Sequence, residues 1–304
     1  MGNPRRIDAH AINHLTVLGS NEITLMPFAY GQSGSSDLIW KDLKWQWWGE
    51  SSQGTEETIL LAQDAGLDVM IKPQIWFDHG SFTGHFSLPS DEEWRTFEAT
   101  YSDYILHYAR MSEKHGLKRF CIGTELCRFV EERPLYWKTL IDSIRTCYSG
   151  QLVYAANWDT YDDFALWNEL DYIGVDAYFP LSESKTPTVR ELVVGWTPHV
   201  LQMKNISEKH RKPVVFTEWG YRSMDFCASK PWEVGHGDDV NLKGQANAYK
   251  AFYIAMYSQP WFAGGYVWKW HPEHEQAGGE KNNRFTPQNK PAEETLRQLF
   301  HASK

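Results

Sequence analysis

The sequence lacks several features that would place it in a membrane or on nucleic acid. It contains no run of 18 apolar residues and no charged-then-apolar leader, so we expect neither a membrane span nor a signal peptide. The net charge is −9 and no cluster of Lys or Arg is present, so the chain has no basic stripe to neutralise phosphates. Nucleic acid is therefore not an expected partner, and both a cytoplasmic and an exported location stay open.

Cysteine is scarce, and the patterns of several catalytic classes are missing. The four cysteines show no C-x-x-C spacing, and Cys121 and Cys147 lie in apolar settings that suit buried free thiols. No Gly-rich phosphate loop, Ser-His-Asp spacing or Cys-His pair is apparent. His271-Pro-Glu-His274 has a spacing that could hold a divalent ion, but Pro272 disfavours the helical turn this would need. We expect no metal and no cofactor.

Aromatic residues, in contrast, are abundant. They make up 15% of the chain and include 15 Trp, more than a core of this size needs. Sugars stack their apolar C–H faces on such rings, so an excess of Trp near strand ends indicates a carbohydrate ligand. Any single Trp is still better interpreted as a core residue.

Strand-like and helix-like segments alternate strictly along the chain, which is the pattern of parallel βα units. A parallel barrel of about 250 residues or more is commonly one domain, so we predict a single (β/α)8 TIM barrel over residues 1–304. Only seven strands are found, and the first barrel strand is therefore expected to be missing, displaced or hidden before Asp8. Strands are expected at 22–30, 68–76, 119–126, 152–158, 171–179, 212–220 and 263–270.

Helices are expected at 8–18, 55–65, after an N-cap at Asp91, near 134–148, in a short stretch before 171, at about 188–210, 245–257 and about 292–302. The helix after Asp91 carries an aromatic stripe that is expected to be core, namely Trp94, Phe97, Tyr101, Tyr104 and Tyr108. Loops are expected at 40–48, which is rich in Trp, at 79–89 and at 222–241.

Two of these strands end in a glutamate. Alternation along 212–220 places Val214, Phe216 and Glu218 on one face, and alternation along 119–126 places Cys121, Gly123 and Glu125 together. A lone Glu at a strand end is more often an exposed loop residue or an ion-pair partner. A pair at the carboxyl ends of barrel strands, where active sites form, is the constellation of a glycosidase.

Further polar and aromatic residues are expected at the same strand ends. Each of them alone could be a satisfied residue of a barrel layer, but together they predict a hydrogen-bonding cup with an indole wall. Such a cup suits a sugar ring, so an oligosaccharide or polysaccharide is the expected partner. The expected binding residues are Lys72, Gln74 and Trp76 on one face of the second strand, and Asn157, Asp176, Tyr178 and Trp268 on others.

Five strings carry a resemblance to a known family: Phe120-Cys-Ile-Gly-Thr-Glu-Leu126, Tyr154-Ala-Ala-Asn-Trp158, Asp171-Tyr-Ile-Gly-Val-Asp-Ala-Tyr178, Val215-Phe-Thr-Glu-Trp-Gly-Tyr221 and Gly265-Tyr-Val-Trp-Lys-Trp270. From about Ile7 to the last helix the chain resembles glycoside hydrolase family 113, within the clan of retaining (β/α)8 enzymes. The resemblance implies that Glu125 is the acid/base, that Glu218 is the nucleophile and that the substrate is β-1,4-mannan. In much of that clan an Asn precedes the acid/base, whereas Thr124 stands here.

Two alternatives remain beside a retaining β-mannanase. The same chemistry could act on another β-linked glycan, such as a glucan, a xylan or a hexosamine polymer. The chain could also be a glycan-binding barrel without catalysis, although binding alone needs no paired carboxylates. We expect a monomer.

Overall fold

A computed structural model describes residues 5–41, 43–78, 80–233 and 239–302. The chain forms two compact units, the first from Met1–Ala9 and Asn21–Tyr172 and the second from His10–Ser20 and Ile173–Lys304. No helix in the described ranges is long and apolar enough to cross a membrane. All four cysteines are free; Cys121 is buried, as expected, whereas Cys147 is partly exposed.

The first unit contains a parallel sheet and a smaller second sheet. The parallel sheet has the order β1 (Glu22–Leu25), β4 (Asp68–Ile71), β6 (Arg119–Thr124) and β7 (Gln151–Asn157). In the smaller sheet, β2 (Phe28–Gly31) lies between β3 (Leu38–Ile39), to which it is antiparallel, and β5 (Gln74–Trp76), to which it is parallel.

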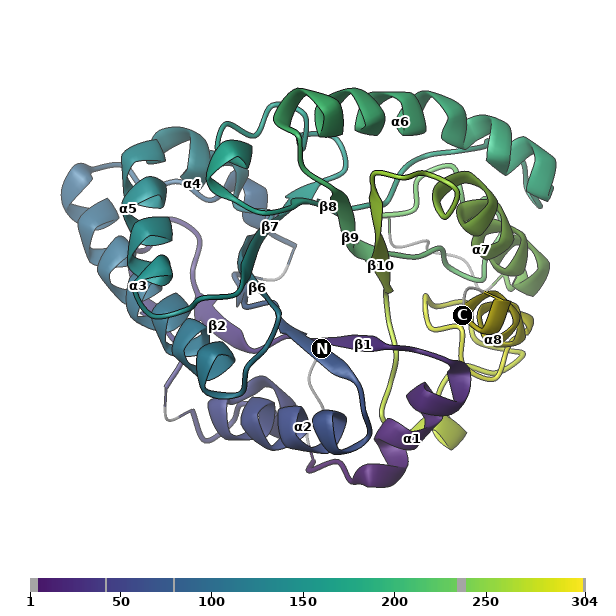
Figure 1. The fold of residues 1–304 in the computed structure, drawn as a ribbon, viewed down its shortest axis with the longest axis horizontal. Helices are drawn as coiled ribbons and strands as arrows, with labels where there is room; N and C mark the ends of the chain where they lie inside the picture. The colour runs from purple at the N-terminus through teal and green to yellow at the C-terminus, as the bar shows by residue number, and fades with distance from the viewer. Residues whose placement is uncertain (1–4, 42, 79, 234–238, 303–304) are drawn as a thin grey trace. The chain divides into compact units, whose positions relative to one another are not determined.

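Helices cover the parallel sheet of this unit. Figure 1 shows α3 (Asp91–Lys114) and α5 (Pro134–Arg145) beside β6. The expected aromatic stripe of α3 (Trp94, Phe97, Tyr101, Tyr104 and Tyr108) is at most 4% exposed, which confirms it as core. The other helices are α2 (Ser52–Asp64) and α4 (Cys127–Glu132), with the short turns η1 (Trp48–Glu50), η2 (Thr83–His85) and η3 (Trp167–Glu169).

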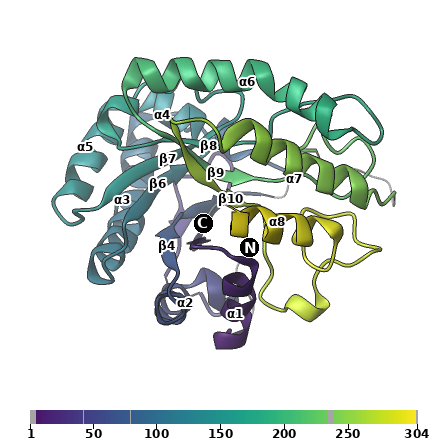
Figure 2. The same cartoon turned by 45° about the vertical axis from the view of Figure 1, so that its right-hand side comes forward.

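The second unit repeats the alternation of strand and helix. Its parallel strands lie in the order β8 (Ile173–Asp176), β9 (Val214–Trp219) and β10 (Phe262–Val267). In Figures 1 and 2, α7 (Leu242–Met256) lies between α6 (Val189–His210) and α8 (Pro291–Ala302). The unit also contains α1 (Ala9–Leu18) and the turn η4 (His274–Gln276).

The described residues thus contain seven parallel strands that alternate with helices, four in the first unit and three in the second. This is the pattern of the TIM-barrel class, as predicted. No strand precedes β1 within residues 5–21, where the expected helix α1 lies instead. Residues 1–4, the other place considered for a first strand, lie outside the described residues.

Two of the expected strands are each split by a proline. The stretch 22–30 forms β1 and β2 with Pro27 between them, and 68–76 forms β4 and β5 with Pro73 between them. Proline has no N–H to donate to a ladder. At each of the two prolines the chain therefore leaves the parallel sheet and enters the smaller sheet. The prediction that Lys72, Gln74 and Trp76 share one face of one strand is therefore wrong, because Lys72 lies between two strands.

The alternation predicted for the two glutamate strands is also wrong. The register of β9 shifts between Phe216 and Glu218, and that of β6 shifts between Cys121 and Thr124. Phe216 packs on Trp196 of α6, so it faces the helices. A Cβ on Gly123 would lie 2.8 Å from Trp137 of α5, so this residue also faces the helices. A bulge moves every later side chain by one position, so the phase assigned before it does not carry to the glutamate.

Several boundaries differ by a few residues. Ser51 caps α2, so this helix begins at Ser52 rather than Thr55, and Ser90 rather than Asp91 caps α3. The strands expected at 171–179 and 263–270 are shorter, and α4 was not expected. Parts of the loops expected at 79–89 and 222–241, namely residues 79 and 234–238, lie outside the described residues.

Candidate active site

In the second unit, Glu218 lies near the carboxyl end of β9 and is 8% exposed. The hydroxyl of Tyr178 donates a hydrogen bond of 2.7 Å to Glu218 Oε2. The ring of Tyr178 packs edge-on against Phe285, with 5.8 Å between centroids. A nearly buried carboxylate with a fixed hydrogen-bond donor is held in one orientation, which suits a group that must meet a substrate atom.

Asp176 supports the same strand end from β8. It is 1% exposed, and its Oδ1 accepts a hydrogen bond of 2.7 Å from the hydroxyl of Thr217. The backbone N–H of Ala177 donates to the carbonyl of Glu218 at 2.7 Å. β8 therefore holds β9 through both side chain and backbone at the position of the glutamate.

Trp268 follows β10 and is partly exposed. Its N–H donates to the carbonyl of Trp219 at 2.7 Å. A Cβ on Gly220 would lie 2.4 Å from the Trp268 carbonyl oxygen, so only glycine permits this approach. These backbone contacts with Trp219 and Gly220, the two residues after Glu218, place Trp268 beside the end of β9. This position is compatible with the expected sugar-stacking role.

In the first unit, Glu125 directly follows β6 and is half-buried. Its N–H donates to the carbonyl of Ala155 at 2.8 Å, and its φ is 51°, in the left-handed region. The next N–H, that of Leu126, donates to the hydroxyl of Tyr154 at 2.7 Å. The chain therefore turns sharply at Glu125 while bonds to β7 hold it on both sides.

The residue before Glu125 has a structural partner. The hydroxyl of Thr124 donates to the carbonyl of Pro73 at 3.3 Å, in the break between β4 and β5. Thr124 thus ties the end of β6 to the proline break.

The remaining residues expected in this unit lie at strand ends but differ in exposure. Lys72 is fully buried, Gln74 and Asn157 are partly exposed, and Trp76 is 44% exposed. Asn157 Oδ1 accepts a hydrogen bond from the N–H of Trp158 at 2.9 Å, which starts the turn after β7. Their contacts with substrate remain predictions.

Three further residues were not singled out from the sequence, namely Tyr30, Trp45 and Arg222. In the first unit, Tyr30 pairs in register with Trp76, and its ring lies 4.6 Å from that of Trp45. In the second unit, Arg222 is 6% exposed and lies 5.2 Å from the centroid of the Phe285 ring. Burial lowers the pKa of Arg222, with a smaller contribution from Arg284. The only sequence signal for Trp45 was its Trp-rich loop, and Arg222 had none beyond its distance of four residues from Glu218.

Each unit thus places a glutamate at the carboxyl end of a parallel strand, with hydrogen-bonding groups and at least one partly exposed Trp. Glu125, Gln74, Trp76 and Asn157 belong to the first unit, and Glu218, Asp176, Tyr178 and Trp268 to the second. A carboxylate pair with such neighbours can supply an acid and a nucleophile to a glycosidic bond.

Comparison with known proteins points the same way. The family described as Glycoside Hydrolase Family 113 matches residues 7–290. The GH113 β-mannanase AaManA from Alicyclobacillus acidocaldarius, solved in complex with ManMIm, is 25% identical with a TM-score of 0.84, covering 100% of this chain and 96% of that one. A GH113 β-1,4-mannanase is 21% identical with a TM-score of 0.82, covering 99% and 97%.

More distant structures share the fold. A fungal β-1,4-galactanase is 14% identical with a TM-score of 0.59, covering 95% of this chain and 89% of that one. No protein sequence of curated function matches the chain. The TIM-barrel class is confirmed.

Proposed function

Because the chain belongs to glycoside hydrolase family 113 and is a glycoside hydrolase, we propose that it cleaves β-1,4-linked mannan or manno-oligosaccharides with retention of configuration. Its two units act as one catalytic domain with Glu218 as nucleophile and Glu125 as acid/base. The observation that carries this proposal is the nearly buried Glu218 carboxylate at a strand end, held by Tyr178.

The proposed reaction has two steps. Glu218 attacks the anomeric carbon while Glu125 protonates the leaving oxygen, which gives a covalent glycosyl-enzyme. Glu125, now a carboxylate, then takes a proton from a water molecule that displaces Glu218. This mechanism requires the two carboxyl groups to lie about 5–5.5 Å apart across the sugar.

The surroundings of Glu218 fit a nucleophile. The Tyr178 hydroxyl donates to its Oε2 and so holds the carboxylate in one orientation for attack. Mannan as substrate is supported by the two GH113 mannanases, whose chains correspond to this one almost end to end.

The substrate is tested by release of reducing ends from mannan, glucan, xylan and chitosan oligosaccharides, with Glu218→Ala as the blank. We expect release from mannan above the others. Release from another polymer instead would assign the same chemistry to a different glycan. Release from none would favour a binding protein without catalysis.

The roles of the two glutamates are tested by rescue with azide. Glu125→Ala should keep its first step on an aryl glycoside with an acidic phenol, and azide should yield a glycosyl azide of retained configuration. Glu218→Ala should fail on both aryl glycoside and polysaccharide, and azide should yield the inverted product. If the two variants behave alike, the assignment is wrong.

A further inference from the structure

Apart from the catalytic residues, the second unit contains a cluster of three metal-ligating side chains. Two come from α1, where His10 and His14 are four residues apart and so lie on the same face of the helix. The third is Glu275 of η4, which lies beside α1 (Figure 1). Within the described residues, this is the only group of three or more His, Cys, Asp or Glu side chains close enough to share an ion.

The three ligand atoms form a nearly equilateral triangle. His10 Nε2 lies 3.1 Å from Glu275 Oε1, His14 Nε2 lies 3.2 Å from the same oxygen, and the two nitrogens are 3.3 Å apart. With metal–ligand bonds of about 2.1 Å, these separations correspond to angles of about 100° at an ion. That angle lies between those of a tetrahedral ion and of one face of an octahedron.

Hydrogen bonds alone do not satisfy this triangle. An imidazole nitrogen that donates to the carboxylate must carry a hydrogen. If both His10 and His14 donate to Glu275, two N–H groups face each other across 3.3 Å. If one nitrogen instead accepts from the other, its contact with the carboxylate joins two acceptors. A cation in place of the hydrogens makes all three contacts favourable.

The surrounding residues hold the ligands in this arrangement. The ring of His14 stacks on that of His274, with centroids 4.1 Å apart and planes 4° apart. His274 Nε2 in turn lies 2.9 Å from Glu293 Oε1. In the His271-Pro-Glu-His274 spacing, His274 is therefore paired with Glu293. Its ring supports the neighbouring cluster through the stack on His14.

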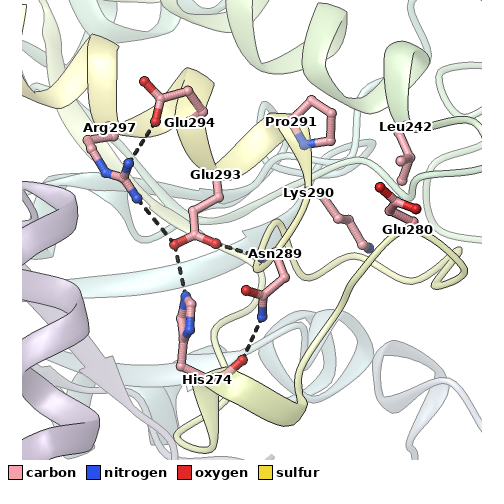
Figure 3. Close-up of a pocket in the computed structure, with 9 residues that line it drawn as sticks. All are labelled: Leu242, His274, Glu280, Asn289, Lys290, Pro291, Glu293, Glu294 and Arg297. Carbon is pink, nitrogen blue, oxygen red and sulfur yellow. Dashed lines mark hydrogen bonds and ion pairs between the residues drawn. The ribbon is translucent and has the colours of Figure 1, made fainter.

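The turn that carries Glu275 is fixed as well. Figure 3 shows Asn289 and Glu293 next to each other, with Glu293 bonded to the His274 ring and Asn289 to the His274 carbonyl. The Asn289 amide donates to the carbonyls of His274 and Ala277, at 2.7 and 2.9 Å, and so closes the turn at both ends. His274, Asn289 and Glu293 line a pocket of 440 Å³ whose wall also includes Lys290 and Arg297. Residues that fix the ligands from outside are a common property of metal sites.

We propose that His10, His14 and Glu275 bind a divalent ion of the zinc class. Two imidazoles and one carboxylate are a donor set that zinc accepts, with the remaining positions left to water. The side chains of His10 and Glu275 are 67% and 63% exposed, so the ion exchanges with solvent. The proposed hydrolysis uses two carboxylates and needs no such ion, so the metal acts on stability.

The expected effect follows from the separation along the chain. His10 and Glu275 are 265 positions apart, so the ion closes a long loop. The unfolded chain does not hold the three ligands together, so the ion binds to the native state only. Binding to the native state only stabilises the fold. The site then ties α1 to η4.

The test is a titration of tag-free, EDTA-treated protein with Zn²⁺, followed by melting temperature, and with Co²⁺, followed by visible absorption. We expect Tm to rise with Zn²⁺ and the Co²⁺ bands to saturate at one equivalent. Glu275→Gln and His14→Ala should each raise the required metal concentration at least about tenfold. Glu275→Gln keeps the shape and removes only the charge, so it covers the case in which the alanine variant folds poorly.

His115→Ala is the matched control. His115 Nε2 lies 2.8 Å from Glu56 Oε1 in the first unit, so this change removes a His–Glu pair that has no second histidine. The control should keep the full response to Zn²⁺. No response in the unaltered protein, or equal responses in it and in both site variants, would overturn the proposal.

Discussion

Tyr178 is the side chain on which the proposed role of Glu218 depends most. Its hydrogen bond to Glu218 is 2.7 Å long and buried. A hydrogen bond to a charged group contributes about 1.5–3 kcal/mol, so Tyr178→Phe should lower kcat/KM by about 10- to 100-fold. The measurement is steady-state kinetics on the best substrate of the panel.

Tyr148→Phe is the control for this variant. The Tyr148 hydroxyl is also buried and donates to the carbonyl of Leu117 at 2.8 Å, at the amino end of β6. Its loss should reduce the melting temperature and leave kcat/KM near that of the unaltered enzyme. If both variants have the same kinetics, Tyr178 has only a structural role.

Trp268 should stack on a bound sugar. The side chain is partly exposed, and the N–H contact with Trp219 that positions it uses the backbone and survives truncation. Trp268→Ala should raise KM or lower kcat so that kcat/KM falls about tenfold or more, with a nearly unchanged melting temperature. A large loss of melting temperature with normal kinetics would show that Trp268 is a core residue.

At the residue scale, the sequence predicts residue types at strand ends but not the direction of the side chains. Glu125 and Glu218 were singled out as a pair, because two predicted parallel strands end in a carboxylate and such ends meet at one face of a barrel. The faces assigned to Phe216 and Gly123 were wrong, because each strand contains a register shift that leaves no mark in residue type. The left-handed backbone of Glu125 likewise follows from bonds to β7 and not from the residue itself.

Among the elements, the paired breaks at Pro27 and Pro73 determine how the first unit is built. β1 pairs with β4 before the prolines, and β2 pairs with β5 after them. Both prolines were visible in the sequence and should have ended the two long strands. That the segments beyond them would form a second sheet was not predictable, because β3 joins it through only two residue pairs.

Tyr104 of α3 bonds to a carbonyl at this break, that of Pro27, which also accepts the N–H of Gln74 at 2.9 Å. Its hydroxyl donates to Pro27 O at 2.8 Å and lies 3.0 Å from Gln74 O, and the side chain is fully buried. Tyr104→Phe removes one of the two donors to this buried carbonyl and should reduce the free energy of unfolding by about 1 kcal/mol. Denaturant titration measures it.

Tyr172→Phe serves as the control, since the exposed Tyr172 hydroxyl donates to Gln151 Oε1 at 3.2 Å. A surface change of this kind should cost at most about 0.5 kcal/mol. Equal losses in the two variants would contradict a special role for the Tyr104 hydroxyl.

For the whole molecule, the number of buried tyrosines predicts sensitivity to alkali. Burial raises the pKa of five fully buried tyrosines above the ordinary value, namely Tyr101, Tyr104, Tyr154, Tyr221 and Tyr249. The unfolded chain loses these protons at about pH 10, whereas the native state keeps them. The native state then binds more protons, so the free energy of unfolding falls as the pH rises above about 10.

Absorbance at 295 nm and far-UV circular dichroism, recorded together between pH 8 and 12, measure this effect. The exposed tyrosines should ionise first, and the buried ones only together with the loss of secondary structure. Ionisation of all tyrosines near pH 10 with unchanged secondary structure would show that burial does not hold their protons.

The fold class was predictable because parallel βα units leave a long, regular alternation, and every strand core is an apolar run. The His10, His14 and Glu275 cluster was not, because its members are up to 265 positions apart and only the two histidines share a helix. Spacing reveals ligands on one element, and the turn that brings a third beside them is a property of the folded chain.

The central claim, that Glu218 is the nucleophile of a retaining reaction, is tested most directly by trapping the covalent intermediate. A 2-deoxy-2-fluoro manno-oligosaccharide with a good leaving group should react once and then hydrolyse slowly, because fluorine slows both steps and the leaving group restores the first. Mass spectrometry of the digested protein then locates the sugar. We predict one adduct per chain on the peptide that contains Glu218, whereas an adduct on Glu125, or no adduct on an enzyme that hydrolyses mannan, would contradict the account.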